Sequence, residues 1–167
     1  MISIFKKHPT DLYNILLTLS RNIFFYKKLK LPDNFETRIY LMFFHFSIFM
    51  IIFKKKQNKF DQKEYDILFQ NIENDLRELG FGDVTVNKKM KQLNKVLYDI
   101  LLKLESNKSD INIFKLDHKL VIKYFSKFKH SKDQEYIIFE TYFLNFYNFC
   151  FELSLDNMIR NAIKFRN

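Results

Sequence analysis

Glycine and proline are almost absent from this chain, and that absence constrains its fold more than any other feature of the sequence. Only two Gly and two Pro occur among 167 residues. Tight hairpin turns need the positive φ angles of glycine, so a β-sandwich or barrel with many turns is nearly excluded. Dinucleotide-binding and phosphate-binding loops need clustered glycines and are excluded as well. Because 47% of the residues are apolar and 28% are charged, we expect one compact, all-α globular domain spanning residues 1–167.

Apolar residues recur at helical spacing along the chain and predict six to seven helices. The start signals are Thr10 as an N-cap, a capping box from Asp33 to Glu36, and Asp61 in a second Asp-x-x-Glu arrangement, and Gly80 is a stop signal. The predicted helices cover residues 10–29, 33–53, 61–79, 86–105, 116–129, 133–152 and 154–165, with a polar loop over 106–112.

The segment 39–53 is the most apolar part of the chain, because thirteen of its fifteen residues are apolar or aromatic. As a helix it is about 22 Å long, which is short of the roughly 30 Å hydrocarbon core of a bilayer. We therefore predict that it is the central helix of the fold, buried on nearly all sides. The alternatives are a membrane-associating helix and a transmembrane helix diluted by Tyr40, His45 and Ser47.

Positive charge is concentrated in the N-terminal third of the chain. The net charge is +9, and residues 1–59 hold eleven basic and three acidic side chains, whereas residues 60–167 hold seventeen and sixteen. An AT-rich codon bias explains part of the lysine excess, but it would spread lysine evenly. The basic third therefore indicates an anionic partner, either nucleic acid or lipid headgroups.

No arrangement of residues in the sequence points to catalysis or to a metal. The one cysteine, Cys150, excludes an internal disulfide and lies in an apolar aromatic stretch, where an inert buried thiol is expected. None of the four histidines pairs at metal-binding spacing. We predict no enzymatic activity, no cofactor, no metal and no small-molecule substrate. His45, alone in the apolar segment, is either a hydrogen-bonded core histidine or a contact with a partner.

Two further stretches have both a structural and a functional interpretation. Lys88-Lys-Met-Lys91 is either a solvated helix end or an anion-contacting patch, because a glycine-containing turn precedes it. The aromatic residues of 136–151 are either core residues or a stacking platform for bases. The absence of Lys and Arg from that stretch favours the core.

Two blocks of the sequence carry a pattern that helical periodicity does not explain. The first contains Leu12-Tyr13, Phe25-Tyr26, Leu31-Pro32-Asp33, Arg38 and Phe44-His45, and the second contains Leu76-Arg-Glu-Leu-Gly-Phe-Gly-Asp83 with Val86, Lys88, Lys89 and Tyr98. Over about residues 12–105 the chain resembles the ubiquinol–cytochrome c chaperone family. It departs from the pattern at Asp99-Ile100, where bacterial members carry Gly-Arg, so a role tied to that arginine does not transfer.

The resemblance implies a non-enzymatic, all-helical assembly factor that binds newly made cytochrome b and promotes assembly of the ubiquinol–cytochrome c reductase (bc1) complex. It also implies contact with bc1 subunits, activity near the ribosome, a cytoplasmic location and peripheral contact with the inner membrane. The start of the chain lacks a secretion signal and a transit peptide, which favours a bacterial member. The alternative function is a basic RNA- or ribosome-binding helical module without a specific client.

Six residues are the candidates for partner binding. They are Arg38, His45, Arg77, Asp83, Lys88 and Lys89. Gly80 is expected to end a helix in a left-handed conformation, and Gly82 to let the chain reverse tightly. Asp83 is expected to cap the turn or the next helix, which would bring the basic candidates around it together at one end of the molecule. This corner is either a helix connection only or a docking site for a partner.

Overall fold

Every regular element that the structure describes is a helix. The computed structural model describes residues 11–106, 114–129 and 134–167, so Thr10 and almost all of the predicted loop lie outside the described residues. The α-helices are α1 (Asp11–Ser20), α2 (Phe35–Lys55), α3 (Gln62–Glu78), α4 (Asp83–Ser106), α5 (His118–Tyr124), α6 (Gln134–Glu152) and α7 (Leu155–Asn161). A short π-helical segment, η1 (Phe24–Lys28), and two 3₁₀ segments, η2 (Ser126–Lys129) and η3 (Ala162–Lys164), accompany them. The predicted all-α fold of six to seven helices is confirmed.

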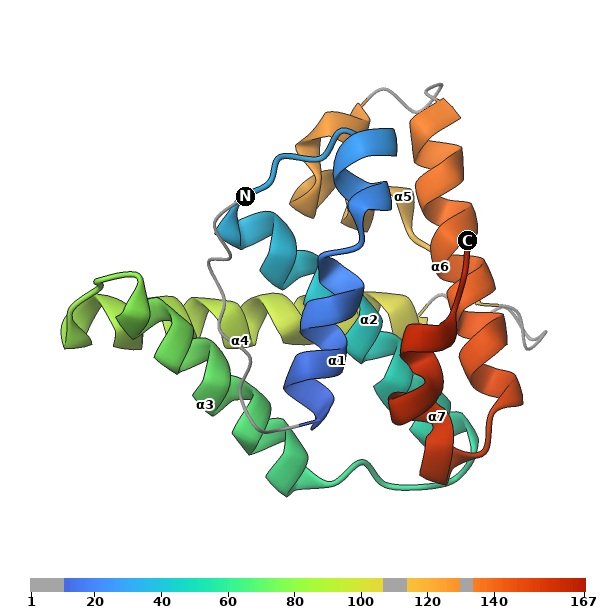
Figure 1. Cartoon of the computed structure of the whole chain (residues 1–167), viewed down its shortest axis with the longest axis horizontal. Helices are drawn as coiled ribbons and strands as arrows, with labels where there is room; N and C mark the ends of the chain where they lie inside the picture. The colour runs from blue at the N-terminus through green and yellow to red at the C-terminus, as the bar shows by residue number, and fades with distance from the viewer. Residues whose placement is uncertain (1–10, 107–113, 130–133) are drawn as a thin grey trace.

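The apolar helix α2 lies at the centre of the fold. Helices α1, α4 and α6 pack against it (Figure 1), and every residue from Ile39 to Phe49 except Tyr40 is buried. Among the described helices, α2 alone is long and apolar enough to cross a membrane, but most of its apolar stretch is covered by the rest of the chain. The prediction of a buried central helix is therefore confirmed.

Aromatic rings of α6 cover one side of α2. The ring centroids of Phe44 and Phe143 lie 5.6 Å apart, and Phe25 of η1 joins them, 4.8 Å from Tyr142. These α6 rings are core residues, as the absence of nearby basic residues predicted. Cys150 is fully buried on the same helix, and burial raises the pKa of its thiol to about 12. The thiol is therefore protonated near neutral pH, as expected for an inert core cysteine.

The first predicted helix, residues 10–29, does not continue past Ser20. The Ser20 hydroxyl donates to a backbone carbonyl one turn earlier at 2.9 Å, and the Asn22 side chain accepts the backbone N–H of Phe24 at 3.1 Å. Tyr26 of η1 then donates its hydroxyl to the Ser20 carbonyl at 2.6 Å. Side chains thus replace the helical hydrogen bonds at this break. The apolar spacing continues across it, so periodicity alone does not detect it.

The start of α2 differs from its prediction by one residue, whereas the start of α3 agrees. Asn34, not Asp33, is the N-cap of α2, because the Asn34 side chain accepts a backbone N–H of the first turn at 2.9 Å. Asp33 instead forms an ion pair with the Arg38 guanidinium. Asp61 caps α3 as predicted, with its carboxylate accepting a first-turn N–H at 2.9 Å.

Two of the later predicted helices are shorter than expected. The predicted helix 116–129 is α5 followed by η2, because the backbone leaves the helical region at Phe125 (φ −125°, ψ 77°). The predicted helix 154–165 is α7 followed by the tighter turn of η3. Such 3₁₀ turns are common at helix ends.

Asp99 stands where the chain departs from the family pattern, and it fastens α5 to α4. Its carboxylate accepts hydrogen bonds from the Tyr124 hydroxyl and from Lys123 Nζ at 2.8 Å, and it pairs with Lys103 Nζ at 3.0 Å. Partial burial alone would raise the pKa of Asp99, but these donors hold it well below its usual range. The aspartate therefore has a packing role in this chain.

We expect Asp99→Asn to lower the free energy of unfolding by about 1 kcal/mol, because the amide loses the charge that holds the two lysines. Urea unfolding near neutral pH measures the change. Asp66→Asn is the matched control, since Asp66 is exposed and accepts only from Gln62 among the described contacts. Its effect should stay within about 0.5 kcal/mol. Equal losses in both variants would contradict the assignment.

Candidate partner-binding corner

Helices α3 and α4 meet at a corner that projects beyond the rest of the molecule (Figure 1). Along their length they pack against each other, and the Tyr65 hydroxyl of α3 donates to Asn94 Oδ1 of α4 at 3.1 Å. Near the tip, Leu76 and Val86 are fully buried, yet neither belongs to the main hydrophobic core. The corner therefore has a small apolar centre of its own. We call the residues from Arg77 to Lys89 the α3–α4 corner.

Gly80 ends α3 with a φ of +93°. The Gly80 N–H donates to the Arg77 carbonyl at 2.9 Å, and the Phe81 N–H donates to the Leu76 carbonyl at 3.3 Å. These two bonds form a Schellman motif, which satisfies the last carbonyls of the helix and needs a residue with positive φ. The prediction for Gly80 is confirmed.

Gly82 does not have the role that the sequence suggested. Its φ is not positive, and a Cβ built on it meets nothing within 4 Å. Its carbonyl accepts the Val86 N–H at 2.9 Å, so Gly82 is the N-cap of α4. The prediction that Gly82 lets the chain reverse is wrong, because Gly80 alone supplies the positive φ.

The structure brings four of the six candidate residues to this corner. The Arg77 guanidinium forms an ion pair with the Asp83 carboxylate across the turn. The Asp83 side chain therefore pairs with Arg77, and among the described contacts it caps no backbone N–H, in contrast to the prediction. Lys89 Nζ lies 4.7 Å from the ring centroid of Phe81, in a cation–π contact. Lys88 is exposed beside them on α4.

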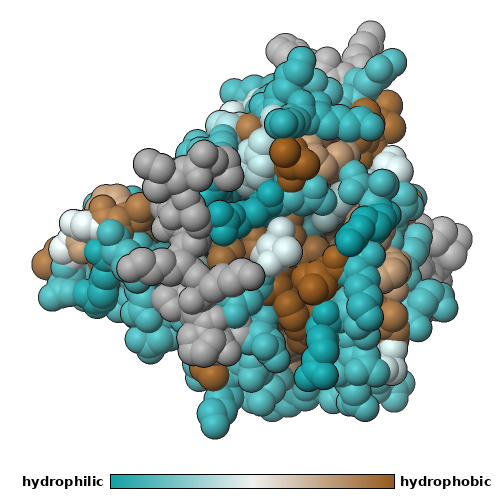
Figure 2. Space-filling view, viewed as in Figure 1, coloured by the Kyte–Doolittle hydropathy of each residue, from teal (hydrophilic) through white to brown (hydrophobic). Residues whose placement is uncertain are grey.

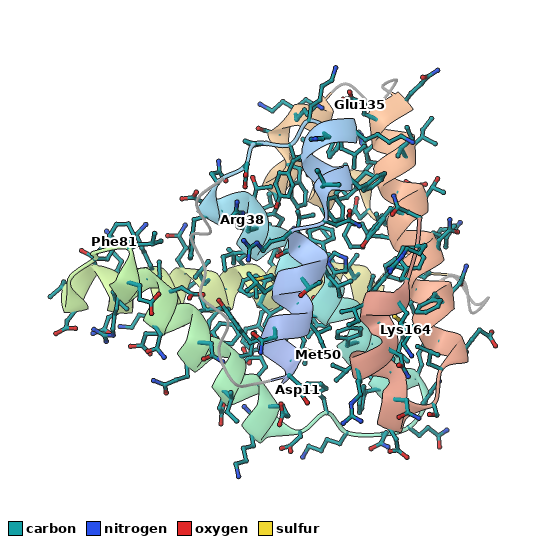
Figure 3. The ribbon with its side chains drawn as sticks, viewed as in Figure 1. Asp11, Arg38, Met50, Phe81, Glu135 and Lys164 are labelled. Atoms are coloured by element: carbon teal, nitrogen blue, oxygen red, sulfur yellow. The ribbon has the colours of Figure 1, made fainter. Side chains whose placement is uncertain are left out.

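Apolar side chains at the corner are open to solvent, and none of them is among the six residues predicted from the sequence to bind a partner. Val84 is 85% exposed, and Leu79 and Phe81 are each 40% exposed. Figure 2 shows hydrophobic atoms at the tip, and Figure 3 shows Phe81 at its outer end. Leu79 follows the last helical residue of α3 and turns outward. In the sequence, the signal that these residues belong to a turn is their position beside the two glycines of the chain.

Arg38 lies inside the protein, at the start of α2. Its side chain is 1% exposed and pairs with Asp33, and Figure 3 shows it near the middle of the molecule. Partial burial raises the pKa of the nearby Tyr26 to about 12, against the opposing effect of the Arg38 charge. Arg38 therefore joins the start of α2 to the segment that precedes it, and it offers almost no surface to a partner.

His45 is fully buried among aromatic rings of η1 and α6. Its Nδ1 lies 2.7 Å from the Leu41 carbonyl oxygen, and its Nε2 lies 3.0 Å from the Tyr142 hydroxyl. A carbonyl only accepts, so Nδ1 carries the hydrogen and Nε2 accepts from the tyrosine. Burial lowers the pKa of His45 to about 4. The geometry is that of a hydrogen-bonded, neutral core histidine.

Titratable residues do not gather into a metal site in the described part of the chain. No group of three or more His, Cys, Asp or Glu lies close enough there to hold a metal ion. Cys150 and His45 are each buried in the aromatic core. The α3–α4 corner, with charged and apolar side chains exposed together, therefore remains as the candidate site, and its chemistry is that of a binding surface.

Comparison with known proteins identifies the family. The family model described as ubiquinol-cytochrome C chaperone matches residues 27–136, which is more than half of the chain, and the chain belongs to this family. The match includes the whole corner and extends through α5 to the start of α6, beyond the resemblance over about 12–105. It does not include α1. No curated protein and no solved structure matches the chain.

The two glycines of the corner should respond oppositely to the same substitution. Gly80→Ser places a side chain at positive φ and should lower the free energy of unfolding by about 1–2 kcal/mol. Gly82→Ser adds a hydroxyl in open space at an N-cap position, so its stability should be equal or slightly higher. Thermal and urea unfolding measure both. A Gly82 variant as unstable as the Gly80 variant would refute this assignment.

The buried His45 should make the protein less stable in mild acid. Because the unfolded chain takes up a proton that folded His45 does not, the free energy of unfolding should fall as the pH drops from 6.5 towards 4. The loss attributable to His45 is about 3 kcal/mol in all. In His45→Gln the pH dependence of the free energy of unfolding should be shallower by nearly one proton than in the unmodified protein. Identical slopes in the two proteins would contradict the neutral core histidine.

Proposed function

We propose that this member of the ubiquinol–cytochrome c chaperone family is a non-enzymatic assembly chaperone that binds newly made cytochrome b and promotes assembly of the bc1 complex. The observation that carries the proposal is the family match over residues 27–136. That stretch contains the α3–α4 corner, where charged and apolar side chains are exposed together. The corner is the surface that we assign to the client.

The chemistry of the corner suits an unassembled membrane protein. Such a client presents apolar helix surfaces next to polar loops before its partner subunits arrive. Phe81 and Val84 offer apolar contact area, and the charges of Arg77, Lys88 and Lys89 lie around them. Aromatic side chains and arginine are enriched at protein interfaces. A projecting corner can also enter a recess on the client, which the broad faces of a helical protein cannot do.

Contacts within the corner hold its side chains in place before a partner arrives. Arg77 is fixed by Asp83 on one side and by Glu73 at 2.8 Å on the other. Lys89 is held over the ring of Phe81. A surface whose side chains are already ordered loses less conformational entropy on binding. The corner therefore needs only a small contact area to bind its client.

The double variant Phe81→Ser with Val84→Ser tests the assignment. Both side chains are exposed, so melting should change little, but crosslinking to newly made cytochrome b should fall by about tenfold or more, the loss expected when an interface aromatic is truncated. In cells that depend on the variant, bc1 content should fall while other respiratory complexes keep their levels.

The control is Leu102→Ser with Ile163→Ser, which removes two exposed apolar side chains away from the corner. The control protein should support full bc1 assembly. If the corner variant also supports full assembly and crosslinks normally, the corner is not the client surface. If the chain itself can be deleted without loss of bc1 complex, the proposed function is wrong.

A further inference from the structure

A small groove lies between the start of α2 and the neighbouring stretch of α4, which pack against each other (Figure 1). Helix α2 lines it with the rings of Phe35 and Tyr40, and α4 lines it with the aliphatic side chains of Leu93 and Val96. The volume of the groove is about 100 Å³. We call it the α2–α4 groove. Its walls are mainly apolar, and none of its apolar residues was a candidate for partner binding.

Lys89 connects the α2–α4 groove with the α3–α4 corner. Its side chain is half-buried and lines the groove. The ammonium of the same residue lies 4.7 Å from the ring centroid of Phe81 at the corner. A partner that covers the exposed part of Phe81 therefore reaches the groove across a single lysine side chain. The two features are parts of one continuous surface.

The charges around the groove cancel each other. Glu36 and Lys89 both line it, and neither forms an ion pair within residues 11–106, 114–129 and 134–167. The remaining polar residue of the rim, Gln92, is neutral and exposed. Burial, and secondly the charge of Glu36, raise the pKa of Tyr40, so its phenol is neutral near pH 7. The groove therefore favours a neutral, apolar occupant over an anion or a cation.

The size of the groove excludes a cofactor or a metabolite of ordinary size. Sites for small molecules usually enclose roughly 300–1,000 Å³. An apolar cavity of about 150 Å³ holds one benzene molecule. The α2–α4 groove, at about 100 Å³, has room for one branched aliphatic side chain, but not for the indole of a tryptophan. Its occupant is therefore one side chain of a larger partner.

We propose that the α2–α4 groove holds one aliphatic side chain, from a leucine, isoleucine or methionine of the client bound at the α3–α4 corner. The inference rests on the proposed function, because that function supplies the client. Burial of such a side chain strengthens binding by about tenfold or more. The polar rim faces the polar neighbours of the inserted residue in the client. The groove thus adds selectivity for side-chain size to the exposed apolar contact at the corner.

The walls of the groove are held by the core, so the groove is already formed before a partner arrives. Val96 is buried, and the ring of Tyr40 lies against Tyr124 of α5, with centroids 5.1 Å apart. The Tyr124 hydroxyl is in turn bonded to the carboxylate of Asp99. A rigid wall of this kind costs little conformational entropy on binding and rejects a side chain that is too large.

Capped single amino acids test the size selectivity on the full chain without the client. N-acetyl-leucinamide should shift the methyl NMR signals of Leu93 and Val96, with a Kd of the order of 1 mM. N-acetyl-alaninamide and N-acetyl-tryptophanamide should shift them far less. Gln92→Trp, which places a ring at the mouth of the groove, should suppress the leucinamide shifts. The matched control is Gln134→Trp, at another exposed glutamine, next to Glu135 at a distant end of the molecule (Figure 3).

Enlarging the groove should change its preference. In Leu93→Ala the wall recedes, so N-acetyl-phenylalaninamide should bind more tightly than N-acetyl-leucinamide, in the reverse of the order in the unmodified protein. Binding to a merely apolar surface would not reverse its order in this way. Leu93 packs partly against the core, so a variant that fails to fold leaves the test to Gln92→Trp. The exposed position of Gln92 should leave melting almost unchanged.

Crosslinking to newly made cytochrome b then tests the occupant. It should fall about tenfold in Gln92→Trp and stay unchanged in Gln134→Trp. The proposal is wrong if leucinamide gives no larger methyl shifts than alaninamide, or if the two tryptophan variants crosslink equally well. A loss in Phe81→Ser with Val84→Ser, but not in Gln92→Trp, would overturn the role of the groove and keep the corner. If the unmodified protein does not crosslink to cytochrome b while leucinamide still occupies the groove, the proposed function itself fails.

Discussion

The all-round apolar surface of α2 determines where every other element lies. A helix with a single apolar stripe is satisfied by one neighbouring layer, whereas α2 must be covered on all sides. Helices α1, α4 and α6 contact it directly, and η1 adds an aromatic ring between α2 and α6. Helix α3 packs mainly on α1 and α4. Because α3 and α4 continue past the edge of this core, their junction projects and stays open to solvent.

Several polar side chains inside this core have hydrogen-bond or ion-pair partners there. His45 bonds to the carbonyl of its own helix and to one tyrosine of α6, and burial keeps the imidazole neutral near pH 7. The Arg38 guanidinium forms an ion pair with the carboxylate of Asp33, five residues earlier in the chain. Tyr13 of α1 donates to Asp75 of α3, and burial together with that carboxylate raises the pKa of Tyr13. The His45–Tyr142 and Tyr13–Asp75 hydrogen bonds each join two helices and fix their register. Aliphatic packing alone specifies a register less sharply.

The sequence predicts the elements of this fold well where the signal is local. Apolar spacing identifies the helices, and the Schellman motif at Gly80 follows from one glycine after an apolar run. The break at Ser20 was not predictable from spacing, because it depends on competing side-chain bonds and on Tyr26 returning to the Ser20 carbonyl. The hydrogen bond from Lys127 to the Leu29 carbonyl could not be foreseen either, since it forms only through tertiary packing. Both the exposure of Val84 and the burial of Arg38 also depend on how far the neighbouring helices extend.

The distribution of exposed apolar groups connects the fold with its activity. Of the eight large hydrophobic side chains exposed in the described ranges, three lie at the α3–α4 corner: Leu79, Phe81 and Val84. Lys88 and Lys89 accompany these apolar side chains, and Lys89 lies over the Phe81 ring. Small, charged and apolar surfaces bind with modest affinity and depend on electrostatic attraction for their rate of encounter. Under the proposed function, contacts of this kind suit a protein that holds an unassembled subunit and then releases it, because a larger apolar surface would bind the client too tightly to allow its transfer.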